Sequence, residues 1–180
     1  MSTAAQMRAL DAAVIDGLGL PGVALMELAS RGVVEQIERH HRADAARGVV
    51  VVTGPGNNGG DGWAIARWLA AGGFPVRVWS VGEPKAGTDA AVMASVARRM
   101  GLPEQRGVDG ARLVVDAVFG TGLDRPPTGP YADAIDAIDA AGVPVVAVDV
   151  PSGLHADTGE ALGRCVHAAR TVTFGRLKLG

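Results

Sequence analysis

The stretch from Val49 to Gly62 constrains the fold of this chain more than any other segment. It begins with four consecutive valines, a run typical of a strand buried on both faces inside a parallel sheet. A glycine-rich segment follows, and apolar residues at helical spacing come after it. The pattern predicts a strand, a loop and a helix whose unpaired N-terminal N–H groups attract anions. A nucleotide or phosphate site is therefore the first hypothesis.

The spacing of these glycines fits G-x-G-x-x-G, which is a weak signal on its own. An ordinary dinucleotide-binding loop is lean in polar side chains, whereas this one carries Asn57, Asn58 and Asp61. The next predicted strand, 76–81, does not end in the acidic residue that would hold an adenosine ribose, and no Gly-Lys-Ser/Thr closes a phosphate loop. The alternative is a glycine-rich turn that merely joins a strand to a helix.

Composition narrows the class of protein. A chain of 180 residues with 48% hydrophobic and 20% charged residues is expected to form one domain, spanning 1–180. Its formal net charge of −2 gives no electrostatic reason to bind nucleic acid or an acidic membrane surface. A single cysteine, Cys165, excludes an internal disulfide framework and fits a reducing compartment. Without a signal peptide or an apolar run long enough to span a bilayer, we expect a cytoplasmic protein.

Strand and helix patterns alternate after residue 48. Two helices are predicted first, one capped by Thr3 and running to about Gly17, and one carrying apolar residues at helical spacing between Leu25 and Ile37. The later strands are predicted at 49–53, 76–81, 113–116, 143–149 and 171–174, and the helices at 60–71, 88–100 and 131–141. We therefore expect an α/β fold: a Rossmann-like three-layer α/β/α sandwich with a mainly parallel sheet, preceded by two N-terminal helices.

Three polar sequences follow predicted strands. They are Asn57-Asn58-Gly59-Gly60-Asp61, the segment 116–123 that starts at Asp116, and Asp149-Val150-Pro151-Ser152-Gly153. Ligands of open parallel sheets bind outside the carboxyl ends of the strands, and those ends share one edge. We therefore expect the three sequences to meet there.

The side chains at this edge suggest acid–base chemistry and a hard cation. Asp116 and Asp149 end apolar strands, where burial raises the pKa of a carboxyl group, although each alone could simply cap a helix or form a turn. Asn58, Asp116 and Ser152 offer only oxygen ligands, which suit an alkali or alkaline-earth ion rather than zinc. The glycine-rich segment 120–126 is long enough to wrap a phosphate or sugar, with Arg125 as a phosphate partner.

Taken together, these motifs resemble the NAD(P)H-hydrate epimerase family, the amino-terminal domain of YjeF-type proteins. The resemblance covers most of the chain. It rests on the segments 6–11, 25–27, 54–62, 116–122 and 149–153, and on the ending Thr171-Val172-Thr173-Phe174-Gly175 with Lys178 and Gly180.

The resemblance implies an enzyme that interconverts the R and S forms of hydrated NADH and NADPH, with a potassium ion as cofactor. It implies a potassium site at Asn58, Asp116 and Ser152. Substrate contacts would come from Asn57, Asn58, Gly59, Gly60, Asp61, Gly120, Thr121, Gly122, Leu123, Asp124, Arg125, Pro126 and Asp149. The dehydratase domain fused to many members is absent, so a separate dehydratase is the expected partner. Members also extend further than Gly180, so the domain is expected to be short at its C-terminus.

Asp149 is the hypothesised acid–base catalyst, with Asp116 and the ion shaping the electrostatic field around it. Lys178 is interpreted as a surface lysine, with a phosphate or ring contact as the weaker alternative. The competing function is a non-catalytic nucleotide-binding or dimerising scaffold module of the same fold. A homodimer is compatible with either function.

Overall fold

The structure, a computed structural model, describes all residues from 1 to 180 and contains one five-stranded sheet in the order β2-β1-β3-β4-β5. Every neighbouring pair of strands is parallel. The strands are β1 (Val49–Thr53), β2 (Val76–Ser80), β3 (Leu113–Ala117), β4 (Val145–Val148) and β5 (Arg170–Val172). The helices from β1 onward are α4 (Asn57–Ala71), α5 (Asp89–Arg99) and α6 (Pro130–Asp139). The predicted parallel α/β architecture is confirmed, with β4 and β5 shorter than expected.

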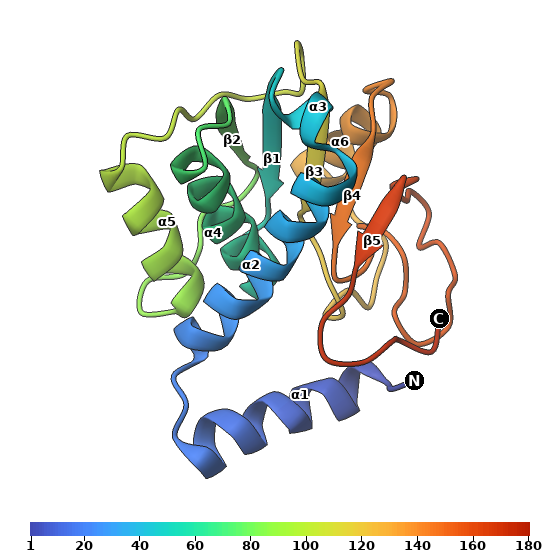
Figure 1. Cartoon of the computed structure of the whole chain (residues 1–180). Helices are drawn as coiled ribbons and strands as arrows, with labels where there is room; N and C mark the ends of the chain where they lie inside the picture. The colour runs from blue at the N-terminus through green and yellow to red at the C-terminus, as the bar shows by residue number, and fades with distance from the viewer.

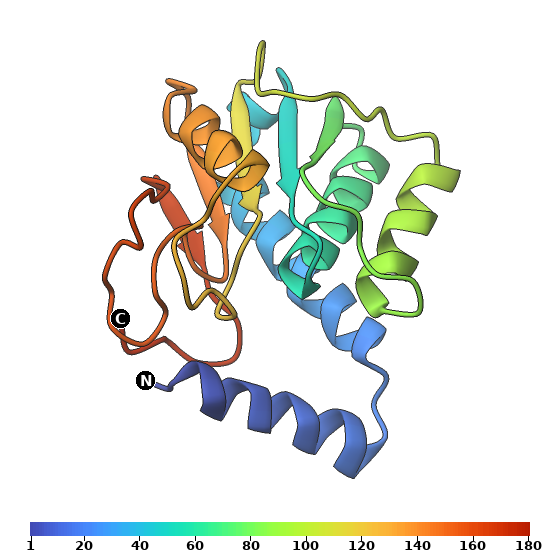
Figure 2. The same cartoon turned by 180° about the vertical axis from the view of Figure 1, so that it is seen from behind.

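The valine run forms the middle of the sheet. Every residue of β1 is buried, and the strand pairs with β2 on one side and β3 on the other. Val49 and Val51 pack under α2 (Gly22–His40), α4 and α5, whereas Val50 and Val52 pack on the α6 side. Both faces of the sheet are thus covered by helices, as Figures 1 and 2 show, and a strand buried on both faces reads as a continuous apolar run.

The helix after the glycine segment begins earlier than predicted. It starts at Asn57 rather than Gly60, so the polar residues expected in a loop form the first turn of α4. Its N-cap, Gly56, supplies no side-chain hydrogen bond to the free N–H groups. Glycines lower intrinsic helix propensity, which hid this turn, but tertiary packing overrides that preference here.

The N-terminal region holds more than the two predicted helices. It contains α1 (Ala4–Ala12), the π-helical segment η1 (Ala13–Gly17), α2 and a short helix α3 (Arg42–Ala45). The predicted cap is confirmed: Thr3 Oγ1 accepts from Gln6 N–H, and Gln6 Oε1 accepts from Thr3 N–H. No helix in the structure has both the length and the apolar character needed to cross a membrane.

The two ends of the chain meet at the carboxyl edge of the sheet. In Figure 1, α1 lies beneath that edge, with the labelled N and C ends close together. Ser2 forms a parallel bridge with Lys178, and its N–H donates to the carbonyl of Leu177 at 2.8 Å. The N–H of Ala4 donates to Asp157 Oδ1 at 2.7 Å. The carboxyl edge is therefore bordered by segments from both ends of the sequence.

Candidate functional site

The glycines after β1 allow neighbouring backbone segments to pack closely. They also leave part of this segment accessible to a ligand. A Cβ on Gly54 would overlap the carbonyl oxygen of Val118, and a Cβ on Gly59 would overlap the carbonyl oxygen of Gly54. Gly59 and Gly60 are buried, whereas Gly56 and Asn57 are exposed. Ligand access is therefore open at Gly56 and Asn57, while the predicted contacts Gly59 and Gly60 lie within the packing.

Asp116 and Ser152 form a fully buried pair that joins the ends of β3 and β4. Ser152 Oγ donates to Asp116 Oδ1 at 2.6 Å, and the N–H of Ser152 donates to Asp116 Oδ2 at 2.8 Å. The N–H of Val118 donates to Oδ1 at 3.3 Å, and the N–H of Phe119 donates to Ser152 Oγ at 2.9 Å. Both carboxylate oxygens are thus occupied, and the pair holds two loops together.

Burial raises the pKa of Asp116 to about 6, although the hydrogen bonds from Ser152 and Val118 favour the ionised form and lower it. The side chain has no exposed surface. The carboxyl group therefore titrates close to neutral pH while remaining closed to solvent.

Gly120 connects this pair to the remaining predicted residues. A Cβ placed on Gly120 would lie 3.1 Å from Asn58 Oδ1 and 3.3 Å from Asp149 Oδ2. Asn58 comes from the first turn of α4, Asp149 follows β4, and Gly120 follows β3. Because Gly120 has no side chain, two polar oxygens from different elements face the same small space. The predicted convergence of the three polar sequences is confirmed.

Asp149 occupies an unusual backbone conformation. Its φ of 67° makes it the one non-glycine residue with positive φ. Its Oδ1 accepts hydrogen bonds from Thr173 Oγ1 at 3.2 Å and from the N–H of Phe174 at 3.3 Å. Its Oδ2 accepts no hydrogen bond from the protein and lies on the side of Gly120. Asp149 therefore presents one held oxygen and one free oxygen.

Lys178 also belongs to this group, and the interpretation of it as a surface lysine is wrong. Its side chain is 6% exposed, and Nζ lies 2.7 Å from Asp149 Oδ1. Lys178 follows β5 in an irregular segment that returns to Ser2. Such a segment has no periodicity from which burial could be predicted. The sequence does place Lys178 only a few residues after the predicted last strand, 171–174. That short separation is a signal that its side chain could lie near the end of the strand.

Two further acids lie near Asp149. Burial raises the pKa of Asp61 well above its usual range, and the charges of Asp149 and Asp11 raise it further. Burial, followed by the charge of Asp149, also raises the pKa of Asp11, while Lys178 lowers it. Asp11 comes from α1 and was absent from the predicted site. Asp61, which was predicted, is the acid of the group whose pKa burial raises most strongly above its usual range.

Most of the loop expected to wrap the substrate, residues 120–126, is exposed. Gly122, Asp124, Arg125 and Pro126 are exposed, and Thr121 and Leu123 are half-buried. Arg125 makes no ion pair or side-chain hydrogen bond. Its guanidinium is therefore free to meet an anionic ligand.

The predicted cation ligands offer only oxygen atoms, which fit a hard cation. Asn58 Oδ1, the Asp116 carboxylate and Ser152 Oγ are all oxygens, and the adjoining Phe119 carbonyl lies 3.3 Å from Ser152 Oγ. Asn58 Nδ2 is buried without a hydrogen-bond partner. Oxygen-only ligands with one formal negative charge suit an alkali ion better than a transition metal.

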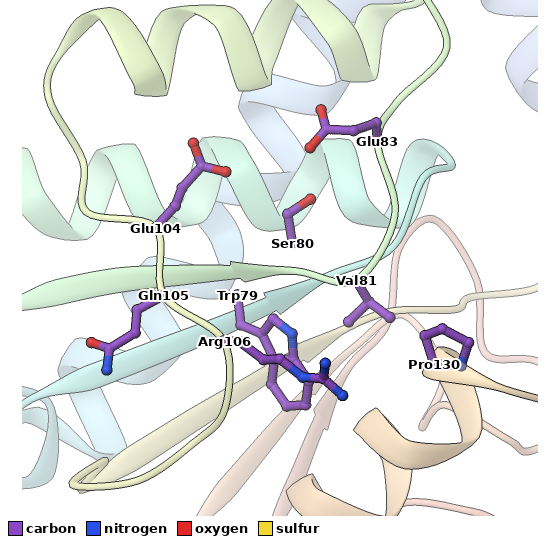
Figure 3. Close-up of a pocket in the computed structure, with 8 residues that line it drawn as sticks. All are labelled: Trp79, Ser80, Val81, Glu83, Glu104, Gln105, Arg106 and Pro130. Atoms are coloured by element: carbon purple, nitrogen blue, oxygen red, sulfur yellow. The ribbon is translucent and has the colours of Figure 1, made fainter.

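A cavity of ≈ 300 Å³ lies elsewhere, at the β2 edge of the sheet. Figure 3 shows Trp79, Ser80 and Val81 around it, with Arg106 and Pro130 on the α6 side. Because β1 and β3 separate β2 from β4, this cavity is distinct from the space beside Asp149. It contains none of the predicted site residues.

Comparison with known proteins gives a consistent result. Residues 22–180 match the family model described as YjeF-related protein N-terminus. The NAD(P)H-hydrate epimerase of Limosilactobacillus reuteri is 44% identical over 99% of this chain and 85% of its own length. The corresponding enzyme of Levilactobacillus brevis is 40% identical over 99% of this chain and 84% of its own length.

A longer relative and a solved structure extend the comparison. The bifunctional NAD(P)H-hydrate repair enzyme Nnr of Thermosynechococcus vestitus is 40% identical, and the match covers 99% of this chain and 35% of that protein. The crystal structure of yeast ynu0 superposes with a TM-score of 0.86 at 24% identity, covering 98% of this chain and 81% of that one. The yeast structure supports the fold.

Proposed function

This chain belongs to the YjeF N-terminal family of NAD(P)H-hydrate epimerases, and we propose that it interconverts the R and S forms of hydrated NADH and NADPH. The observation that carries this proposal is the half-held carboxylate of Asp149, with Oδ2 free beside Gly120 and Asn58. A group that gives and later takes a proton needs one oxygen free of protein donors. A non-catalytic scaffold would not require that arrangement.

Asp149 performs the proton transfers in this proposal. The protonated carboxyl group gives its proton to the C6 hydroxyl, and the C6–O bond breaks as water leaves with the bonding electrons. The ring nitrogen stabilises the resulting cation. Water then adds to the opposite face of C6, and its surplus proton returns to Asp149. The carboxyl group ends as it began, so no further reactant is consumed.

Substrate binding is proposed to use the first turn of α4 and the loop after β3. The exposed Gly56 and Asn57 leave backbone N–H groups available to the diphosphate, which helix N-termini favour. Gly59, Gly60 and Asp61 shape that turn from within. The segment from Gly120 to Pro126 covers the nucleotide, with Arg125 pairing to a phosphate.

A potassium ion is the proposed cofactor, held by Asn58, Asp116 and Ser152. When bound it supplies a fixed positive charge beside the substrate. Ser152 Oγ donates to the Asp116 carboxylate and accepts from the N–H of Phe119, so these bonds fix both oxygen ligands in place. The expected result is that KCl raises both the thermal unfolding midpoint and the turnover of the wild type, whereas choline chloride at equal ionic strength does not. Equal responses to the two salts would contradict a potassium site.

The proposed setting is a cytoplasmic repair step in which the domain, residues 1–180, works with a separate dehydratase. The Nnr relative, named as a bifunctional repair enzyme, supports coupling of two activities. The half-buried, unpaired Cys165 is compatible with a reducing compartment. A homodimer is also proposed, to be tested by light scattering.

The direct test is a coupled assay. A mixture of both hydrate forms is first exhausted by an S-specific dehydratase with its nucleotide cosubstrate, and the purified chain is then added. Epimerase activity will produce renewed absorbance of reduced nicotinamide as the R form is converted. A flat trace from folded protein with potassium present would instead favour the scaffold function.

A further inference from the structure

The carboxylate of Asp149 is fixed by one short segment that follows β5. Three donors from that segment reach the same oxygen, Oδ1. They are Thr173 Oγ1 at 3.2 Å, the N–H of Phe174 at 3.3 Å and Lys178 Nζ at 2.7 Å. With Oδ1 held from one side, the plane of the carboxylate is set and Oδ2 is directed to the Gly120 side.

The ammonium group of Lys178 has no capacity for another partner. Besides Asp149, Nζ contacts Thr173 Oγ1 at 2.9 Å and the carbonyl oxygens of Phe174 at 2.9 Å and Arg176 at 3.2 Å. An ammonium has three N–H donors, and four acceptors surround this one. Its side chain is 6% exposed. Lys178 therefore does not serve as a contact for a substrate phosphate or ring.

We propose that Lys178 is a positioning residue that fixes the orientation of the Asp149 carboxylate. This inference rests on the proposed function of Asp149. Lys178 acts through that carboxylate and does not itself touch the substrate.

The surrounding charges explain why a buried cation is needed there. Asp149 is faced by Asp61 from α4, by Asp11 from α1 and by Lys178 from the C-terminal segment. Lys178 is the single cation in this set. Without it, no side chain of the protein would place a positive charge beside Asp149 and the two other acids.

Lys178→Met tests the proposal because methionine keeps an unbranched stem and removes the charge. We expect kcat to fall about 100-fold, because a misdirected carboxylate transfers protons poorly, while KM changes by less than about threefold. Lys85→Met, at the chain's other lysine, which is exposed, should leave both quantities unchanged.

Two results would overturn the proposal. One is an undiminished kcat in Lys178→Met. The other is a rise in KM without loss of kcat, which would indicate a substrate contact. If Lys178→Met does not fold, Thr173→Val takes its place, since the Thr173 hydroxyl donates to Asp149 and accepts from Lys178. That variant should lose about tenfold in kcat with KM little changed, and unchanged kinetics would count against Lys178.

A measurement without substrate separates this proposal from the proposed function. In protein labelled with ¹⁵N-lysine, the Nζ signal of Lys178 should persist at neutral pH, because its protons are buried and hydrogen-bonded, while that of Lys85 exchanges away. Asp149→Asn should shift the Lys178 signal. If the wild type lacks epimerase activity but this coupling is seen, the function fails and the pair stands. A Lys178 signal that exchanges like that of Lys85 refutes the pair.

Discussion

Asp116 and Asp149 end adjacent strands of the same sheet, yet their carboxylates differ in burial and in hydrogen bonding. Asp116 is fully buried, and both of its oxygens accept hydrogen bonds from Ser152 or Val118. Asp149 is half-buried, has a left-handed backbone and leaves Oδ2 free. Adjacent positions on a sheet edge thus give one carboxylate that joins loops and one that can react.

The contrast separates the roles proposed for the two aspartates. The pKa of Asp116 is raised to about 6 by burial, which by itself would make it the better acid–base candidate. Access decides otherwise, because a carboxyl group closed on all sides cannot exchange a proton with a substrate. A perturbed pKa identifies a site, whereas a free oxygen identifies the reacting group.

The largest effect is expected for Asp149→Asn, with kcat falling about 10³-fold. Asparagine tolerates the left-handed region, so the backbone should be retained, while the thermal midpoint should fall because Lys178 loses its ion-pair partner. The coupled assay measures the loss. Asp133→Asn, at an exposed acid on α6, serves as the control and should be fully active. Full activity of Asp149→Asn would show that Asp149 is not the acid–base catalyst.

Asp116→Asn should act on stability through pH. The folded state raises the pKa of Asp116 from 3.8 to about 6, so its contribution is complete below the lower value and is lost as pH rises through the upper one. In potassium-free buffer, the stability of the wild type relative to Asp116→Asn should therefore decline by about 2–3 kcal/mol from pH ~4 to pH ~7. Urea unfolding across this range measures the difference. A difference independent of pH would show that Asp116 is not perturbed.

The smallest effect is expected at Gly120, the glycine between Asn58 and Asp149. Gly120→Ala adds a Cβ at 3.1 Å from Asn58 Oδ1 and 3.3 Å from Asp149 Oδ2, so these groups must shift by a few tenths of an ångström. We expect kcat/KM to fall about tenfold, with stability changed by less than about 1 kcal/mol. Gly32→Ala, in α2 and outside the proposed site, is the matched control, since nothing lies within 4 Å of its added Cβ. Equal activity of the two variants would place the reacting groups elsewhere.

Much of this arrangement follows from sequence, because parallel strands carry their ends to one edge. The valine run, the alternation after residue 48 and the polar residues after three strands were sufficient to bring Asn58, Asp116 and Asp149 together. These positions are fixed by strand order and hydrophobic period, which local patterns report well.

The remaining features of the site depend on tertiary contacts, which the hydrophobic periodicity of the sequence does not reveal. The first turn of α4 is helical because glycines there pack against neighbouring backbone, an effect of tertiary structure. Lys178 is buried by an irregular segment, and its partner lies at the end of another strand. Asp11 arrives from α1, whose place beneath the sheet edge depends on contacts with residues near the C-terminus.

The bridge between Ser2 and Lys178 has a consequence for the timing of folding. Contacts between residues so distant in sequence form late, because the whole intervening chain must be ordered first. On dilution from denaturant, helical circular dichroism should therefore recover before epimerase activity does. On the ribosome, a nascent chain can therefore bury its valine core before Lys178 reaches Asp149.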